Sequence, residues 1–314
     1  GVSNQSCHQY LDWYLTQMAP QHLWLFQSLH KQYEEAAKSI LELVSKPNKD
    51  LKDAALSFDD RLSWLLRGIG FARASGNSNL FIEIQRTYNI ASVQKEYFQH
   101  LKDEHRNEKT DDLMTPQSLF DNLTSDGYWD SLLKLLAIVP INTTRKENAI
   151  SQVWENYLIT QDEASLSKTQ NDIVYLVNSI NKNSNINGTG AGNRLENTND
   201  VLNVEIIAPL FENYKNQHEG DTLWACDTLL KCGIRPYFLF KFYSKLLKNP
   251  DFAEDKKPDC FYILLYLNTL HKDGPWDVSI LKEKVEWFRE NVYQQTVSDK
   301  FNAKWYVNLN LDEI

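Results

Sequence analysis

Apolar residues recur at helical spacing from Trp24 to Val292, and this pattern constrains the fold more than any other feature of the chain. Within residues 21–45 and 58–75 they return at steps of three and four: Ala36, Ala37, Ile40, Leu41 and Val44, then Leu62, Leu65, Leu66 and Ile69. A stripe with this period lies on one face of a helix, so each segment predicts an amphipathic helix. Pro47 and Asn48 end the first helix, and Ser57 or Asp59 can cap the second. Helix, break and helix form the smallest repeat of a stacked α-helical array.

The same pattern continues along the chain and predicts about 14 helices in all. Beyond the opening pair, we expect helices near residues 79–106, 116–123, 127–139, 146–160, 167–181, 201–218, 220–232, 236–248, 258–271 and 277–295. Residues 132–139 are apolar nearly all round, which predicts a central position in the stack. Sustained alternation of apolar and polar residues, the signal of a β-strand, does not occur in the sequence. We therefore predict an all-α fold, an elongated α-solenoid of stacked antiparallel helix pairs.

Residues 181–200 interrupt the helical pattern with a tract rich in Asn, Gly, Ser and Thr. Such a tract buries too little apolar surface to offset its ordering entropy, so we interpret it as a flexible surface insertion. It could also mark a boundary between two halves. The Gly-rich run 188–192 lacks the preceding strand and following helix of a phosphate-binding loop, which favours a linker. We expect residues 1–314 to form a single α-solenoid domain, the C-terminal part of a longer chain.

Composition excludes several classes of protein. The net charge of −9 argues against nucleic acid as the main partner, because phosphate binding requires a dominant basic surface. The four cysteines show no spacing typical of secreted scaffolds and are interpreted as reduced, buried thiols of a cytosolic or nuclear protein. No window of 18 apolar residues exists, so the sequence predicts no membrane-spanning helix.

No catalytic or metal-ligating motif stands out. His100 and His105 are five residues apart, which places them on different faces of a helix and argues against shared metal ligation. Cys226 and Cys232 do not have zinc-knuckle spacing and are expected to pack in the core. The sequence therefore predicts a protein that is not an enzyme and has no cofactor or metal, although dispersed acidic residues leave an all-α enzyme as an alternative.

The segment 229–249 is the most suggestive surface feature. Leu239, Phe242, Tyr243 and Leu246 can face inward, which leaves a basic and partly aromatic face toward solvent: Lys231, Arg235, Phe238, Lys241, Lys245 and Lys248. This face could receive an acidic or hydrophobic peptide segment. The alternative is a solvated face whose cations compensate the helix dipole. Trp305 and Tyr306, within 296–314, are further candidates for docking a partner.

Several of these segments resemble one family in the same order along the chain. They are 23–45, 60–75, 119–138, 153–158 and 229–250, with a Glu-Ala-Ala helix, an Asp-Arg-Leu helix start and Gly233 before the last basic helix as anchors. This order resembles the C-terminal α-solenoid of the inner-ring scaffold nucleoporins, the nucleoporin 155/157/170 family. An Asn-rich insertion fits a fungal, budding-yeast version related to nucleoporins 157 and 170.

The resemblance implies a structural role in the inner ring of the nuclear pore complex, at the nuclear envelope. Members hold the scaffold together by binding segments of linker nucleoporins, here through inter-helix grooves, and so support pore assembly and nucleocytoplasmic transport. Membrane contact belongs to an N-terminal propeller that this chain lacks, and the family offers no catalytic residues. Two alternatives share these helix-level features: an outer-ring solenoid of the nucleoporin 133 type, and a vesicle-coat or transport-adaptor solenoid.

Overall fold

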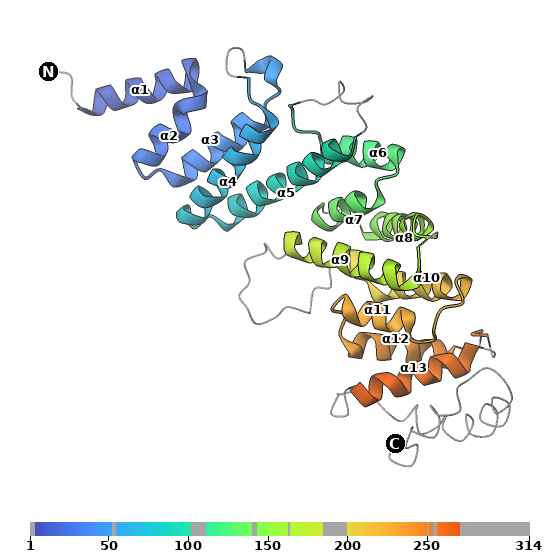
Figure 1. Cartoon of the computed structure of the whole chain (residues 1–314). Helices are drawn as coiled ribbons and strands as arrows, with labels where there is room; N and C mark the ends of the chain where they lie inside the picture. Colours follow the sequence, from blue (N-terminus) through green and yellow to red (C-terminus); the bar gives the residue numbers. More distant parts are fainter. Residues whose placement is uncertain are drawn as a thin grey trace. The chain divides into compact units, whose positions relative to one another are not determined.

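Helices make up all the regular structure in the described part of the chain (Figure 1). The computed structural model describes residues 4–51, 55–101, 111–139, 143–162, 164–184, 200–249, 251–253 and 256–270. These ranges hold the α-helices α1 to α13 and two short 3-10 helices, η1 and η4, and they contain no strand. The predicted all-α fold is confirmed. The predicted helix at 277–295 lies outside the described residues.

The chain divides into two units. Unit 1 comprises residues 1–153 and 179–192, and unit 2 comprises 154–178 and 193–314. Unit 1 contains α1 (Asn4–Met18), α2 (Pro20–Leu29), α3 (Tyr33–Ser45), η1 (Asn48–Asp50), α4 (Phe58–Ser75), α5 (Ser78–His100), α6 (Pro116–Asp126), α7 (Trp129–Ile138) and most of α8 (Thr143–Ile159). Unit 2 contains the end of α8, most of α9 (Leu166–Ser184), η4 (Asp200–Leu202), α10 (Val204–Gln217), α11 (Trp224–Lys231), α12 (Pro236–Lys248) and α13 (Lys257–Leu270).

Most predicted helices occur, with shifted ends. Helix α5 ends at His100, and residues 102–110, which the long predicted helix 79–106 included in part, lie outside the described residues. Helix α9 runs on to Ser184, so the first residues of the predicted 181–200 insertion are helical. Asp200 belongs to η4, and residues 185–199 lie outside the description.

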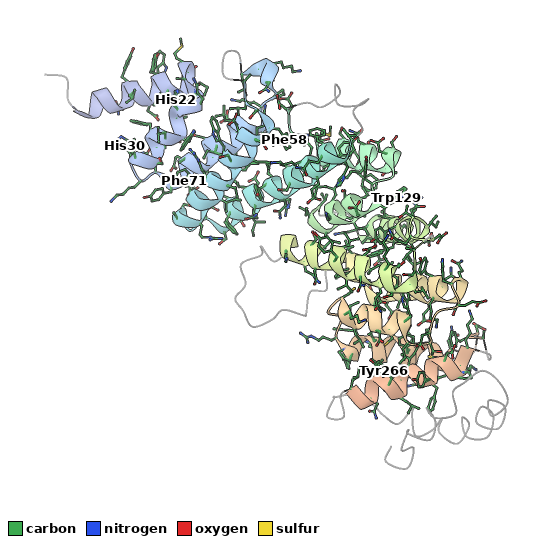
Figure 2. The ribbon with its side chains drawn as sticks, in the orientation of Figure 1. His22, His30, Phe58, Phe71, Trp129 and Tyr266 are labelled. Carbon is green, nitrogen blue, oxygen red and sulfur yellow. The ribbon has the colours of Figure 1, made fainter. Side chains whose placement is uncertain are left out.

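The core of unit 1 is built by α3, α4 and α5, which lie side by side (Figure 1). Ala36 and Ala37 on α3 are fully buried, as their place on the predicted stripe requires. Gly68 allows α4 to approach both neighbours, because a Cβ atom there would lie 3.2 Å from Ile40 of α3 and 3.4 Å from Ile84 of α5. A ring contact adds to this packing: Phe58, at the start of α4 (Figure 2), meets Phe98 of α5 edge-on at a centroid distance of 5.7 Å.

Two residues of the predicted stripes do not belong to the core. Leu66 is 53% exposed and Leu41 is half-buried, whereas Leu43 is buried. The start of α4 follows the prediction, since Ser57 is its N-cap and forms a capping box with Asp60. Residues 132–136 of α7 supply four buried leucines, whereas residues 137–139 of the predicted apolar run are half-buried.

A buried arginine closes the irregular segment between α3 and α4. The Arg61 side chain is fully buried and donates hydrogen bonds to the Val44 and Lys46 carbonyls, the latter at 2.8 Å. Its second terminal nitrogen donates to Asn48 Oδ1 at 2.8 Å and forms an ion pair with Asp112 at 2.9 Å. Burial lowers the pKa of Arg61, and the adjacent Asp112 opposes that shift. Arg61 therefore ties the segment after α3 to the segment before α6.

Unit 2 is organised around buried aromatic residues whose polar atoms are hydrogen-bonded. Trp154 is fully buried, donates from Nε1 to the Val201 carbonyl at 3.0 Å, and meets Phe211 edge-on at 5.5 Å. Trp224 donates from Nε1 to the Leu166 carbonyl, also at 3.0 Å. A buried indole N–H without an acceptor would cost free energy, so each of these hydrogen bonds holds its tryptophan ring in a single orientation.

Helix α13 is attached to the rest of unit 2 by packing and by a hydrogen bond. It packs against α12, and Tyr266 donates to Asp227 of α11 at 2.8 Å (Figure 2). Burial, first, and the hydrogen bond to Asp227 together raise the pKa of Tyr266 to about 12, so the phenol stays a donor at neutral pH. In this way α10, α12 and α13 acquire the fixed spacing on which the groove described below depends.

Candidate partner-binding surfaces

Helix α12 presents the predicted basic face. Its first residue is Pro236, whose fixed φ suits the first turn of a helix, and its apolar face is buried, including Leu239, Phe242 and Tyr243. Leu246, also predicted to face inward, is half-buried. The inward and outward faces of α12 are therefore oriented much as the sequence predicts.

The predicted contact residues of this face differ in their surroundings. Lys231 is exposed and donates to Gln170 at 2.5 Å, and Lys245 is exposed and pairs with Glu205 at 3.0 Å. Lys241 is exposed, whereas Arg235 and Phe238 are half-buried. Exposed pairs of this kind contribute little, about 1 kcal/mol at most, so a partner could displace them. Trp305 and Tyr306, the other two predicted contacts, lie outside the described residues.

A groove that the sequence analysis did not identify lies beside this face of α12. It has a cavity volume of about 220 Å³ within unit 2. Its lining residues come from α10, α12, α13 and the segment before α13: Pro209, Glu212, Asn213, Lys215, Asn216, Phe242, Tyr243, Leu246, Phe252, Lys256, Asp259, Cys260 and Ile263. Helix α12 packs against both α10 and α13, so its side chains form the floor and the other two helices form the walls.

The floor of this α10/α12/α13 groove is apolar and closely packed. Phe242 is 3% exposed and Tyr243 is 1% exposed, and Ile263 on the α13 wall is 1% exposed. Tyr243 donates to Glu212 at 2.6 Å, and Lys215 forms an ion pair with the other oxygen of Glu212 at 2.6 Å. Burial and the Glu212 carboxylate both raise the pKa of Tyr243, so its phenol remains a donor. Both oxygens of Glu212 are therefore engaged inside the protein.

Asp259 on the α13 wall is in a different state. It is half-buried and accepts a hydrogen bond from Thr222 at 3.4 Å, which is long. Burial is the main cause that raises the pKa of Asp259, and Lys215 opposes this while Glu212 and Asp221 add to it. Asp259 is thus a partly desolvated carboxylate with spare capacity to accept a hydrogen bond.

The sequence could not reveal this groove because its walls come from separate helices. One local signal existed, since Pro209, Asn213 and Asn216 place polar or helix-breaking residues at steps of four and three on α10. Lys256, just before α13, and Asp259 and Ile263 on the α13 wall follow one another at steps of three and four. Neither pattern is distinctive without knowledge that α12 lies between the two helices.

Helices α1 and α2 expose apolar side chains as well. Most of the large hydrophobic residues that are exposed in the described part of the chain lie on these two helices: Tyr10, Leu11, Trp13, Tyr14, Met18, Leu25 and Leu29. Asp12 is their sole charged residue apart from histidines. Large apolar side chains exposed in such number on two short helices are typical of regions that contact other protein.

Reactive chemistry finds no support among the described residues. They contain no group of three or more His, Cys, Asp or Glu side chains that could hold a metal ion. Cys226, Cys232 and Cys260 are free and buried, and burial raises their pKa values, to about 12 for Cys232. Both Cys226 and Cys232 thus lie in the core, as expected. His105 and the Cys7 side chain lie outside the description, and no described helix is long and apolar enough to cross a membrane.

Helices packed against one another, with a groove between three of them, are the architecture of α-helical scaffold proteins. Residues 5–308 match the family described as the non-repetitive/WGA-negative nucleoporin C-terminal, and the chain belongs to that family. No curated protein sequence matches the chain.

Two solved structures share its fold. A methionine-substituted mutant of the Chaetomium thermophilum Nup170 C-terminal domain is 15% identical, with a TM-score of 0.67 over 95% of this chain. The Chaetomium thermophilum Nup170 structure denoted SOL is also 15% identical, with a TM-score of 0.64 over 93% of this chain. The chain spans 64% and 46% of the lengths of these two proteins. The predicted nucleoporin resemblance and the predicted location at the nuclear pore complex are confirmed by the family match, and the fold is that of the Nup170 C-terminal domain.

Proposed function

We propose that the chain is a non-enzymatic scaffold element of the inner ring of the nuclear pore complex, and that it binds extended segments of linker nucleoporins in grooves between its helices. Membership of the nucleoporin family supports the scaffold role in the pore. The α10/α12/α13 groove is the single observation that supports peptide binding, because it combines a buried apolar floor with polar groups at its edges.

The dimensions of the groove suit a peptide side chain better than a cofactor. Pockets for small molecules typically enclose about 300–1,000 Å³. The groove, at about 220 Å³, is smaller. Peptide segments gain affinity by placing a few side chains in such pockets while their backbone runs along the surface. A scaffold that holds linkers needs sites of this size at intervals along its helices.

The exposed basic face of α12 is a second proposed contact. Arg235, at the start of α12, and Phe238 and Lys241 on α12 belong to the same helix that supplies the floor of the groove. A linker segment with acidic residues beside its anchor would contact this face, whereas a merely solvated face would contribute nothing to binding.

Binding of synthetic peptides tests the proposal. Overlapping 15-residue peptides would cover the extended segments of inner-ring linker nucleoporins, outer-ring nucleoporins and vesicle-coat adaptors from the source organism. We expect saturable binding of a subset of inner-ring peptides to the purified chain, measured by fluorescence polarisation. Binding restricted to outer-ring or coat peptides, or absence of binding throughout, would refute the proposed function.

Crosslinking mass spectrometry of assembled pore complexes tests the same proposal in context. Crosslinks from lysines near the groove, such as Lys256 and Lys241, to a linker nucleoporin are the expected result. Crosslinks from these lysines to outer-ring subunits alone would contradict the assignment to the inner ring.

A further inference from the structure

We propose that the α10/α12/α13 groove recognises an extended peptide through one bulky apolar anchor residue and a neighbouring lysine or arginine, which pairs with Asp259. This inference rests on the proposed function, since it specifies which linker chemistry one of the grooves accepts. Three features of the groove lead to it: the size of the apolar floor, the exposed amides on α10 and the state of Asp259.

The apolar floor sets the size of the anchor. A cavity of about 150 Å³ lined by apolar side chains is enough to bind a benzene molecule. The groove, at about 220 Å³, therefore has room for one aromatic or large aliphatic side chain. Phe242 and Ile263 would contact that side chain, and both are already almost fully buried. Little further ordering of the protein is needed when the anchor enters, which favours affinity.

The α10 wall offers hydrogen bonds to a peptide backbone. Asn213 and Asn216 are both exposed, lie about one helical turn apart and line the groove. Each carboxamide carries a donor and an acceptor, so it can pair with the N–H and C=O of an extended chain. A helical peptide uses its own backbone groups internally and could not form these bonds. The two asparagines therefore favour an extended occupant.

Asp259 supplies the preference for a cation. Glu212, the other carboxylate of the groove, already holds Lys215 at 2.6 Å and Tyr243 at 2.6 Å. Asp259 receives the long Thr222 bond and is partly desolvated. Lys256, also on the rim, is exposed, so water screens its charge. A lysine or arginine that arrives with an anchor in the groove would meet Asp259 in a less solvated setting, where pairing is stronger. The net charge of −9 also favours the approach of basic segments.

A double-mutant cycle tests the pairing. The probes are peptides that bind the chain in the 15-residue series, each remade with its anchor-proximal lysine or arginine replaced by norleucine. We expect the replacement to weaken binding to the wild-type chain by about tenfold, and to have almost no effect on binding to Asp259→Asn. Equal losses for both proteins would overturn the proposed pairing.

Two further variants locate the site. Leu246→Trp fills the groove from its half-buried lining position and should weaken binding at least tenfold, and Asn216→Ala removes an exposed amide and should weaken it by a few-fold. Lys241→Ala tests the basic face of α12 separately, because this exposed residue does not line the groove. Lys168→Ala is the matched control, because this exposed lysine of α9 neither lines the groove nor belongs to the basic face. Circular dichroism and thermal unfolding of each variant confirm that it is folded.

The outcomes separate this inference from the proposed function. If peptides bind, and binding is weakened at least tenfold in Leu246→Trp and a few-fold in Asn216→Ala but retained in Lys241→Ala, the groove is the site. If peptides bind and Lys241→Ala alone weakens them, the basic face of α12 is the site, so the inference fails while the proposed function stands. If no linker peptide binds the wild-type chain, the proposed function fails and the inference fails with it.

Discussion

Removal of the Arg61 side chain should destabilise unit 1 more than any surface change. In the variant Arg61→Ala, the Val44 and Lys46 carbonyls lose the donor that Arg61 supplies, whereas Asn48 Oδ1 keeps its hydrogen bond from the Leu56 N–H. A buried polar atom left without a partner costs about 1–3 kcal/mol. The Asp112 side chain is 34% exposed, so water can rehydrate it and the lost ion pair adds about 1 kcal/mol at most. We therefore expect a loss of about 3–5 kcal/mol in the free energy of unfolding.

Two measurements check this expectation. Urea unfolding followed by tryptophan fluorescence reports the free energy, and hydrogen exchange of backbone amides reports local opening. Amides in residues 46–51 and 111–114 should lose protection first, because Arg61 joins these segments. The matched control is Arg86→Ala, an exposed arginine on α5, which should change the stability by about 0.5 kcal/mol or less. A loss below about 1 kcal/mol in Arg61→Ala, or unchanged exchange in these segments, would refute the reasoning.

Three further predictions concern packing, thiols and pH. Gly68→Ala should destabilise the folded chain by about 1–3 kcal/mol, because the new Cβ would meet Ile40 at 3.2 Å. Gly70→Ala has nothing within 4 Å of its Cβ and should stabilise α4 by about 0.5–1 kcal/mol. Equal shifts of the urea midpoint in the two variants would contradict this. Cys232, buried and with its pKa raised to about 12, should react with Ellman's reagent at pH 8 only after denaturant is added, and prompt labelling by mass spectrometry would show otherwise. The pKa of Asp259 is raised in the folded state, so its ionisation opposes folding as the pH rises through that pKa. Asp259→Asn should therefore be at least as stable as the wild-type chain at pH 7 and should lose that advantage at acidic pH. Thermal unfolding of both proteins at the two pH values tests this.

The helices could be predicted from the sequence, but the burial of individual residues could not always be. Residues of an α-helix turn about 100° apart. On α4 the buried face includes Arg61 and Gly68 as well as Leu65 and Ile69, so its centre is displaced from the leucine stripe. Leu66 lies about 100° from that centre and is exposed. A pattern that counts only apolar residues misses the contribution of a buried arginine and a glycine.

The groove was beyond sequence analysis for a related reason. Phe242 and Tyr243 were expected to face inward, which is correct, but the sequence does not say what they face. Asn216 and Asp259 can be recognised as parts of one site only in the structure, where α12 packs between their helices and all three line the same groove. The basic residues were easier to notice because charge is visible in a sequence, whereas a cavity is a property of packing.

The bonds made by Arg61 bear on how such a chain can diverge over time. Val44 and Lys46 contribute only their carbonyl oxygens to these bonds, so Lys46, whose side chain is 43% exposed, could be replaced without loss of the contact, whereas Val44 is held by its place in the core. Asn48 and Asp112 contribute side-chain atoms and are therefore far less replaceable. The hydrogen bonds of Arg61 therefore restrict the side chain at only a few separate positions, and neighbouring exposed positions can change in sequence. A fold that restricts few side chains in this way can be shared at low sequence identity, as this chain and the Nup170 C-terminal domain share theirs at 15%.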